Sequence, residues 1–233
     1  MSAFLKGMRH GIPIALGYLS VSFGFGILAA KHFGALVATI ISMTNLTSAG
    51  QLAGVNIMAE GNTAISGYLE MALTQLIINM RYGLMGISLS QKLDSTFNTP
   101  RRLVASFGIT DEIFAVASSQ PGKITANYMY GMILIAFLGW TSGTFLGAVA
   151  GEILPPSVTD AMGLALYGMF LAIIIPPARK SRGVLVVVAA AAGCSLIFKF
   201  LLPFVTSGFA VIICAIAAAA LGAWLFPVKE ENA

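Results

Sequence analysis

Charged residues are scarce in this chain. They make up 9% of its 233 residues, whereas a typical soluble domain has about 25%. Hydrophobic residues make up 58%, and apolar runs of about 20 residues, long enough to cross a hydrocarbon core, recur from end to end. This composition excludes a soluble fold and predicts an all-α, polytopic membrane protein. The formal net charge of +4 does not indicate nucleic-acid binding, because the basic residues lie in short loops between apolar runs.

Cysteine, histidine and catalytic motifs are also rare or absent. The two cysteines, Cys194 and Cys214, lie inside apolar runs and are expected to pack as free thiols. The sequence has no zinc-type cluster and none of the motifs for serine hydrolysis, metalloprotease chemistry or phosphate binding. The acids Asp111 and Glu112 are adjacent, so they cannot face each other on a helix as an intramembrane aspartyl pair must. We therefore expect no enzymatic activity, no cofactor and no metal.

The continuous apolar runs predict six full membrane spans within a single integral-membrane domain, residues 1–233. They cover residues 11–30, 64–91, 127–150, 157–177, 183–201 and 204–226. The first run follows a short basic segment, as a signal peptide would. Its length, its Pro13 and the Lys31 that follows it favour a retained first helix.

Two further apolar stretches, residues 35–58 and 103–126, are interrupted by polar residues, Gly and Pro. Irregular backbone at membrane depth is tolerated only where protein buries it or where it lines a cavity, and such segments mark binding sites in transporters. The stretches could be re-entrant hairpins, or they could cross fully and give eight spans. With two hairpins and a cytoplasmic N-terminus, nine of the thirteen basic residues face inward, which favours the hairpins: Lys6, Arg9, Lys92, Arg101, Arg102, Lys123, Arg179, Lys180 and Arg182.

The second interrupted stretch carries two adjacent carboxylates, Asp111 and Glu112, in an otherwise apolar run. A carboxylate near the centre of a spanning helix costs roughly 2.5–3.5 kcal/mol, so it must face protein or water. Gly108 loosens the preceding helix, and the Thr110 hydroxyl can cap a new one. We therefore expect a broken helix with a polar site at Thr110, Asp111 and Glu112.

The span 64–91 supplies the expected partner of these acids. Arg81 lies too deep to reach the inner loop, so we expect it to pair with Asp111 or Glu112. The pair could line a substrate path, or it could only pin two helices together. Asn79 shares one helix face with Gln75 and Tyr82, and this polar face is not expected to contact lipid. Glu70 is expected near the outer boundary, in contact with water, and is not chosen as a site residue.

The first interrupted stretch holds a run of small and hydroxyl-bearing residues from Asn45 to Gln51, with Ser48 between them. A half-helix that begins here would direct free N–H groups and a positive dipole end at an anion such as a carboxylate. Alternatively, these residues form a polar contact surface between two packed helices and bind no ligand.

Glycines recur every fourth residue in the span 127–150, at Gly139, Gly143 and Gly147. This spacing places them on one helix face, where a neighbouring backbone can approach closely. The face could pack within the chain or form a subunit interface.

Several of these elements together resemble the AzlC family, the large subunits of bacterial branched-chain amino acid exporters. The resemblance covers nearly the whole chain and rests on Pro13 with Gly17, Phe23-Gly24, Ser48-Ala49-Gly50-Gln51, Asn79-Met80-Arg81-Tyr82 and Thr110-Asp111-Glu112-Ile113-Phe114-Ala115. It implies a multi-pass secondary transporter of the bacterial inner membrane that exports Leu, Ile, Val and in some members Met. It also implies a small AzlD-like membrane subunit as partner.

The residues fit this resemblance, because a zwitterionic amino acid needs a cation site, an anion site and an apolar pocket. We expect the ammonium group near Asp111 or Glu112 and the carboxylate at Arg81 or at the amides of 45–51. A carboxylate in a partly dry site can also load a proton for antiport. The alternatives are a carrier for another small zwitterion, a channel-like pore and a scaffold subunit that transports nothing.

Overall fold

The computed structural model describes residues 2–61, 65–155, 157, 158, 161, 168, 171 and 174–227. In chain order the helices are α1 (Ala3–Thr44), α2 (Ser48–Ala59), α3 (Ile65–Ser90), α4 (Thr99–Phe107), α5 (Asp111–Ser119), α6 (Ala126–Ile153), α8 (Arg182–Leu201) and α9 (Ser207–Leu225). Within the described residues, α1, α6, α8 and α9 are long and apolar enough to cross a membrane. The prediction of a helical, polytopic membrane protein is confirmed. The predicted span 157–177 lies mostly outside the described residues.

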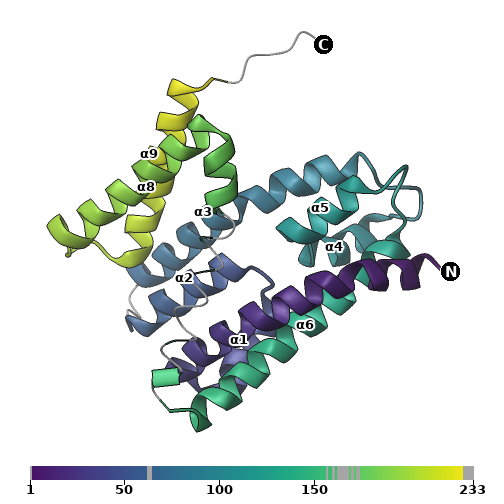
Figure 1. Cartoon of the computed structure of the whole chain (residues 1–233), viewed down its shortest axis with the longest axis horizontal. Coiled ribbons are helices and arrows are strands. Elements are labelled where there is room, and N and C mark those ends of the chain that lie inside the picture. The colour runs from purple at the N-terminus through teal and green to yellow at the C-terminus, as the bar shows by residue number, and fades with distance from the viewer. Residues whose placement is uncertain are drawn as a thin grey trace. The chain divides into compact units, whose positions relative to one another are not determined.

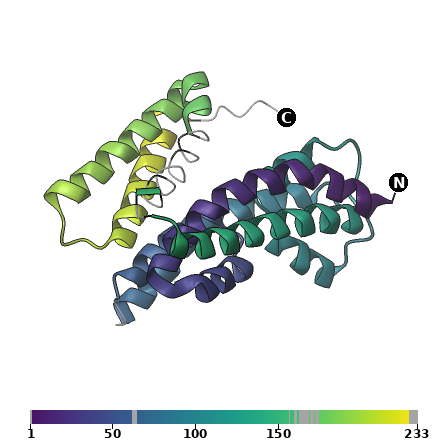
Figure 2. The same cartoon turned by 60° about the horizontal axis from the view of Figure 1, so that its bottom comes forward.

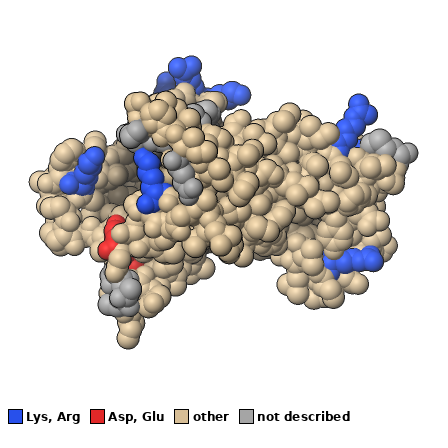
Figure 3. Space-filling view, turned by 90° about the horizontal axis from the view of Figure 1, so that it is seen from below, with Lys and Arg blue, Asp and Glu red and all other residues tan. Residues whose placement is uncertain are grey.

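The chain divides into two compact units. The first unit contains residues 1–55 and 78–166, and the second contains residues 56–77 and 167–233, so the boundary passes through α2 and α3. The prediction of a single membrane domain stays a prediction. Figure 3 shows one face of the molecule, on which uncharged residues dominate and Lys and Arg side chains stand out singly, as the low charge content requires.

Helices α1 and α6 lie side by side along their lengths and form the centre of the first unit (Figures 1 and 2). Glycines on α6 make the contact close. A Cβ atom added to Gly139, Gly143 or Gly147 would collide with the backbone of α1 at Ala15, Leu19 and Phe23, respectively. The contact points advance by four residues in the same direction on both helices, so α1 and α6 run parallel. The glycine face expected from the sequence thus packs within the chain, against α1.

The first interrupted stretch folds into a hairpin made of the last part of α1, residues 35–44, and α2. We call it the first hairpin. The turn into it is at Gly34, whose φ of 75° only glycine adopts without strain. Ala38 on one arm and Val55 on the other belong to one buried cluster with Ala148 of α6. Both arms therefore lie beside the same part of α6, which favours a re-entrant hairpin over two crossings.

The second interrupted stretch, α4 and α5, forms the second hairpin. Asn98 caps α4, and Thr110 caps α5 by accepting a hydrogen bond from the Ile113 amide at 3.4 Å. The residues before α4 and after α5 lie together: the Asp94 amide donates to the Ile124 carbonyl at 3.0 Å. The stretch therefore returns to the side on which it begins. Its length of nine residues per helix, about 13 Å each, is half of a membrane thickness.

The second unit is built from α8, α9 and the first part of α3. Helices α8 and α9 pack as a pair of apolar helices, with the side chain of Val187 filling the space in front of Gly222. Cys194 and Cys214 lie on these two helices as free thiols.

Candidate functional site

The tips of the two hairpins approach a single pair of aromatic residues in the first unit. Tyr18 of α1 and Trp140 of α6 stack edge to face, with ring centroids 5.3 Å apart. Gln51 of the first hairpin accepts a hydrogen bond from Trp140 Nε1 at 3.0 Å, and Thr110 of the second hairpin contacts the Tyr18 hydroxyl at 2.5 Å. We call Gln51, Trp140, Tyr18, Thr110 and Glu112 the tip cluster.

The positions of these contacts along α6 show how the hairpins are arranged. The bases lie at opposite ends: Ala148 packs with the first hairpin, and Tyr130 donates a hydrogen bond to the Arg101 carbonyl of the second. The tips reach the middle, where Trp140 meets Gln51 and Ile133 lies against Gly108. Seven residues of helix, about 10 Å, separate these two contacts. Two half-length hairpins thus approach from opposite ends of α6 and bring their broken backbone to its centre, the arrangement in which irregular backbone is tolerated at membrane depth.

The N-terminus of α5 carries the acidic part of the tip cluster. The Tyr18 hydroxyl lies 2.5 Å from both Thr110 Oγ1 and Glu112 Oε2. A phenol has one proton, and Thr110 Oγ1 already accepts from the Ile113 amide. All three groups are satisfied when the Thr110 hydroxyl donates to Tyr18 and Tyr18 donates to the Glu112 carboxylate. The carboxylates in the first turn also complement the positive end of the helix dipole.

Arg81 of α3 reaches this N-terminus from the side. Its Nη1 lies 2.7 Å from Asp111 Oδ2, so the structure forms one of the two ion pairs that the sequence allowed. Nη2 donates to the Tyr82 hydroxyl at 3.2 Å, and the guanidinium carbon lies 5.0 Å from the centre of that ring. The two side chains are 45% and 41% exposed, so the ion pair is open to the surroundings of the first unit.

Gln51 is enclosed by protein, with 2% of its surface exposed. Its Nε2 donates to backbone carbonyls around the break, including that of Asn45, while its Oε1 accepts from Trp140. Asn45 itself accepts from Thr47 Oγ1 at 2.6 Å. These bonds hold the break in the first hairpin together, and Ser48, the first residue of α2, is half-buried beside it.

Asn79 lies on α3 two residues before Arg81 and is half-buried. No group of three or more His, Cys, Asp or Glu side chains that could hold a metal ion occurs among the residues that the structure describes.

Two members of the tip cluster, Tyr18 and Trp140, were not predicted. Each stands in an apolar run where an aromatic residue is ordinarily a packing residue, so nothing in the spacing distinguishes them. The one available signal is that both carry a polar group, which a buried position must satisfy.

The prediction for Glu70 is wrong. Its side chain is buried in the second unit, 1% exposed, where it contacts the N-terminus of α9. Its Oε1 accepts from Thr206 Oγ1 at 2.5 Å, from the Gly208 amide at 2.7 Å and from the Phe209 amide at 3.3 Å. Glu70 therefore caps a helix from a different part of the chain, because the first amides of α9 need an acceptor and Thr206 does not provide a side-chain cap.

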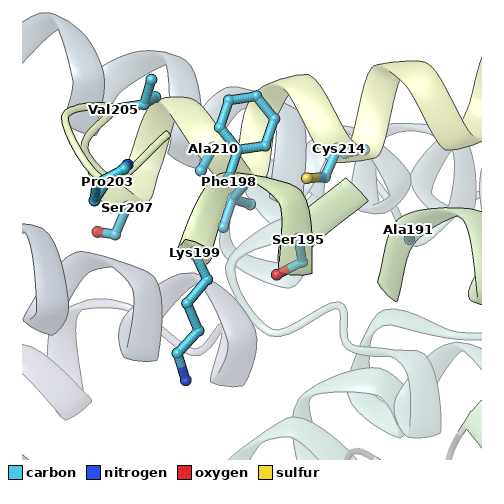
Figure 4. Close-up of a pocket in the computed structure, with 11 residues that line it drawn as sticks. Ala191, Ser195, Phe198, Lys199, Pro203, Val205, Ser207, Ala210 and Cys214 are labelled. Carbon is cyan, nitrogen blue, oxygen red and sulfur yellow. The ribbon is translucent and has the colours of Figure 1, made fainter. Parts of the chain in front are cut away.

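The second unit also holds a cavity of about 610 Å³ between α8 and α9 (Figure 4). Its walls are mainly apolar, with Ser195, Ser207 and Lys199 as polar members. Figure 4 shows the Lys199 side chain extending away from Phe198 and Cys214. Its ammonium lies 5.7 Å from the centre of the Phe200 ring, as expected of a lysine that keeps its stem on an apolar surface and its charge outside.

Comparison with known proteins gives one family. The family described as AzlC protein matches residues 13–154, which include both hairpins and the tip cluster. The inner membrane protein YgaZ of Escherichia coli K12 is 26% identical over 210 residues, covering 87% of this chain and 84% of YgaZ. A membrane protein of Archaeoglobus fulgidus is 28% identical over 224 residues, covering 95% of this chain and 94% of its own. No solved structure matches significantly.

Proposed function

Since this chain belongs to the AzlC family of membrane proteins, we propose that it is the large subunit of a secondary transporter that exports branched-chain amino acids. The substrates are Leu, Ile and Val, with Met as a further candidate. The observation that carries the proposal is the half-exposed Arg81–Asp111 ion pair at the tip of the second hairpin. It places opposite charges at the broken tip of a half-length hairpin, as an amino acid carrier requires.

The ion pair provides a mechanism for binding a zwitterion. A free amino acid has an ammonium and a carboxylate a few ångströms apart, so it can insert between Asp111 and Arg81. Each charge of the protein then exchanges one partner for another, and no bare ion is left at membrane depth. The 41% and 45% exposure of these side chains leaves room for this exchange, whereas a fully buried pair would resist it.

The tip cluster positions this site. Glu112 is fixed by Tyr18, Tyr18 packs on Trp140, and Trp140 is bonded to Gln51 in the other hairpin. Movement of one hairpin is thereby coupled to the other through contiguous contacts, which alternating access requires of a carrier. In this role Gln51, Thr110 and Tyr18 are positioning residues, and Asn45, Ser48 and Asn79 remain candidates for direct contact with substrate.

Proton coupling is part of the proposal. Asp111 and Glu112 are the two carboxylates at the site, and either can carry a proton in the step opposite to substrate export. Replacing Asp111 with Asn and Glu112 with Gln should abolish uptake driven by a proton gradient. Proton-driven transport that is unchanged in both variants would overturn the coupling.

The proposal also includes an orientation of the chain in the membrane and a partner subunit. A cytoplasmic N-terminus in the bacterial inner membrane places the base of the second hairpin, with Arg101, Arg102 and Lys123, on the positive-inside face. The partner is a small AzlD-like membrane subunit, for which exposed apolar side chains on the described helices offer a packing surface.

Leucine counterflow in proteoliposomes tests the function, with the purified chain alone and with an AzlD-like subunit added. Saturable exchange that is stimulated by internal leucine is expected of a carrier. Unsaturated flux that follows the membrane potential would indicate a channel, and an absence of exchange for every branched-chain amino acid in both preparations would overturn the substrate assignment.

A further inference from the structure

A second feature of the first unit involves the residues that follow Arg81 on α3. A cavity of about 330 Å³ opens between α3, α4 and the start of α6. Ligand pockets in proteins occupy about 300–1,000 Å³, so this cavity suits a small molecule. It begins near the base of the second hairpin, at Leu93, Phe97 and Arg102, and ends at Ile109. Ile109 lies two residues before Asp111, and Gly83 lies two residues after Arg81, so lining residues of the cavity neighbour both members of the ion pair along the chain.

Part of the wall formed by α3 has no side chains. Gly83 and Gly86 line the cavity, and they fall on the same helix face as Asn79, one and two turns further along. A Cβ atom at Gly83 would meet nothing within 4 Å, and one at Gly86 would meet only Ile109 Cδ1, at 3.9 Å. These glycines therefore differ from those of α6, where a Cβ atom would collide with the backbone of α1. Glycine at 83 and 86 leaves space that no described part of the first unit fills.

Most of the remaining lining is apolar, and its polar members are Ser90, Ser106 and Arg102. Ile87, Leu89, Ile109 and Met129 contribute apolar surface, and Arg102 contributes a cation near the base of the hairpin. An aliphatic amino acid has the complementary pattern, with a branched apolar side chain and a carboxylate at one end. A carboxylate held at Arg102 leaves the side chain free to enter the apolar interior.

We infer that this cavity is a loading site for the aliphatic side chain of the exported amino acid, with Arg102 attracting the carboxylate, on the way to the Arg81–Asp111 pair. The inference rests on the proposed function and adds a residue that sets the upper limit of substrate size. Gly86 is that residue, since any side chain there shortens the cavity without displacing backbone.

Export of Leu, Ile and Val by the chain and by its Gly86→Ala and Gly86→Val variants tests this. Gly86→Val should lower the export of Leu and Ile by roughly 10-fold or more, because a lost methylene site is worth that much in an apolar pocket. Export of Val by Gly86→Val should fall less. The Gly86→Ala variant should export Leu and Ile at rates between those of the wild type and Gly86→Val. Gly193→Val is the matched control, because a Cβ atom at Gly193 of α8 also meets nothing within 4 Å. Equal export of all three substrates by Gly86→Val and the control would overturn the inference.

A second measurement does not depend on transport. Gly86→Cys, in a background where Cys194 and Cys214 are Ala, should react with a small thiol reagent, and leucine should slow the reaction. Reaction at the same rate with and without leucine would overturn the inference. Protection by leucine in a chain that exports no branched-chain amino acid would sustain the binding site and overturn the proposed function, so the two failures are distinguishable.

Discussion

The N-termini of α5 and α9 both have carboxylates beside them, yet these carboxylates differ in their partners and in their exposure. At α5 the acids belong to the helix itself, and Asp111 is half-exposed and paired with a cation. At α9 the acid is Glu70 from α3, which is 1% exposed and accepts bonds from neutral donors among the described residues. Glu70 has the surroundings of a structural cap. Asp111 has the access and the exchangeable partner that binding a charged substrate requires.

This difference shows how to distinguish ionisable groups in a membrane protein. An ionisable group is energetically costly at any place in the membrane, so its presence alone does not distinguish a structural role from a functional one. The two cases differ in the partners of the carboxylate. Backbone amides are fixed and cannot move without unwinding a helix, whereas a guanidinium lies at the end of a flexible side chain and can move. Substitutions at the two helix N-termini test this difference.

Arg81→Ala should lower leucine export on the order of 100-fold, because it removes the cation proposed to hold the substrate carboxylate, and a hydrogen bond to a charged group is worth roughly 1.5–3 kcal/mol. The thermal stability of the purified protein should change little, because the pair is half-exposed. Arg81→Lys is the control, as it keeps the charge and should retain part of the export. A large loss of stability in Arg81→Ala would assign the pair a structural role like that of Glu70.

Glu70→Ala should destabilise the protein by about 3 kcal/mol, because it leaves the buried amides of Gly208 and Phe209 without their acceptor. Glu70→Gln keeps an acceptor oxygen and should lose less stability than Glu70→Ala. Thermal unfolding in detergent, followed by size-exclusion chromatography, measures both. Glu60→Ala, at an exposed acid just after α2, is the control and should unfold as the wild type does. Equal stability of Glu70→Ala and this control would contradict the capping role.

Tyr18→Phe should lower export about 10-fold while the protein stays folded. It removes the hydroxyl that joins Thr110 to Glu112, a hydrogen bond to a charged group worth about 1.5–3 kcal/mol. Tyr68→Phe, on an exposed part of α3, is the matched control and should export normally. Wild-type export by Tyr18→Phe would remove Tyr18 from the positioning of the site.

Trp140→Phe should cost about 1 kcal/mol of stability, because it removes the hydrogen bond to Gln51 and keeps most of the packing. A double-mutant cycle with Gln51→Leu isolates this bond, since the two losses should be less than additive. Full additivity would show that the first hairpin is held at Trp140 by packing alone.

Sequence patterns predicted the parts of this fold that depend on local chemistry. Apolar length predicted the four spans that correspond to α1, α6, α8 and α9, whereas α3, at the predicted span 64–91, is not among the candidate spans of the described residues. Gly108 with Thr110 predicted the break before α5, because a flexible residue followed by a capping residue is a local signal. The cost of a lone charge in lipid predicted a partner for Arg81. The choice between Asp111 and Glu112 needed the structure, because it depends on which face of α5 turns towards α3.

The parts of the fold that the sequence patterns did not predict depend on contacts between residues far apart in the chain. Tyr18 and Thr110 are 92 positions apart, and Glu70 and Gly208 are 138 apart. No periodicity within α3 shows that Glu70 meets the start of α9. Likewise, the spacing of Gly83 and Gly86 cannot show that the space in front of them is open, whereas that in front of Gly147 is filled by α1.

The most direct test of the central claim compares two carboxylates in one assay. Leucine counterflow is measured for Asp111→Asn and Glu70→Gln in proteoliposomes, with each rate normalised to the amount of folded protein. We expect Asp111→Asn to lose nearly all exchange and Glu70→Gln to retain most of it. Retention of exchange in Asp111→Asn with loss in Glu70→Gln would place the transport site at the N-terminus of α9 and contradict the account.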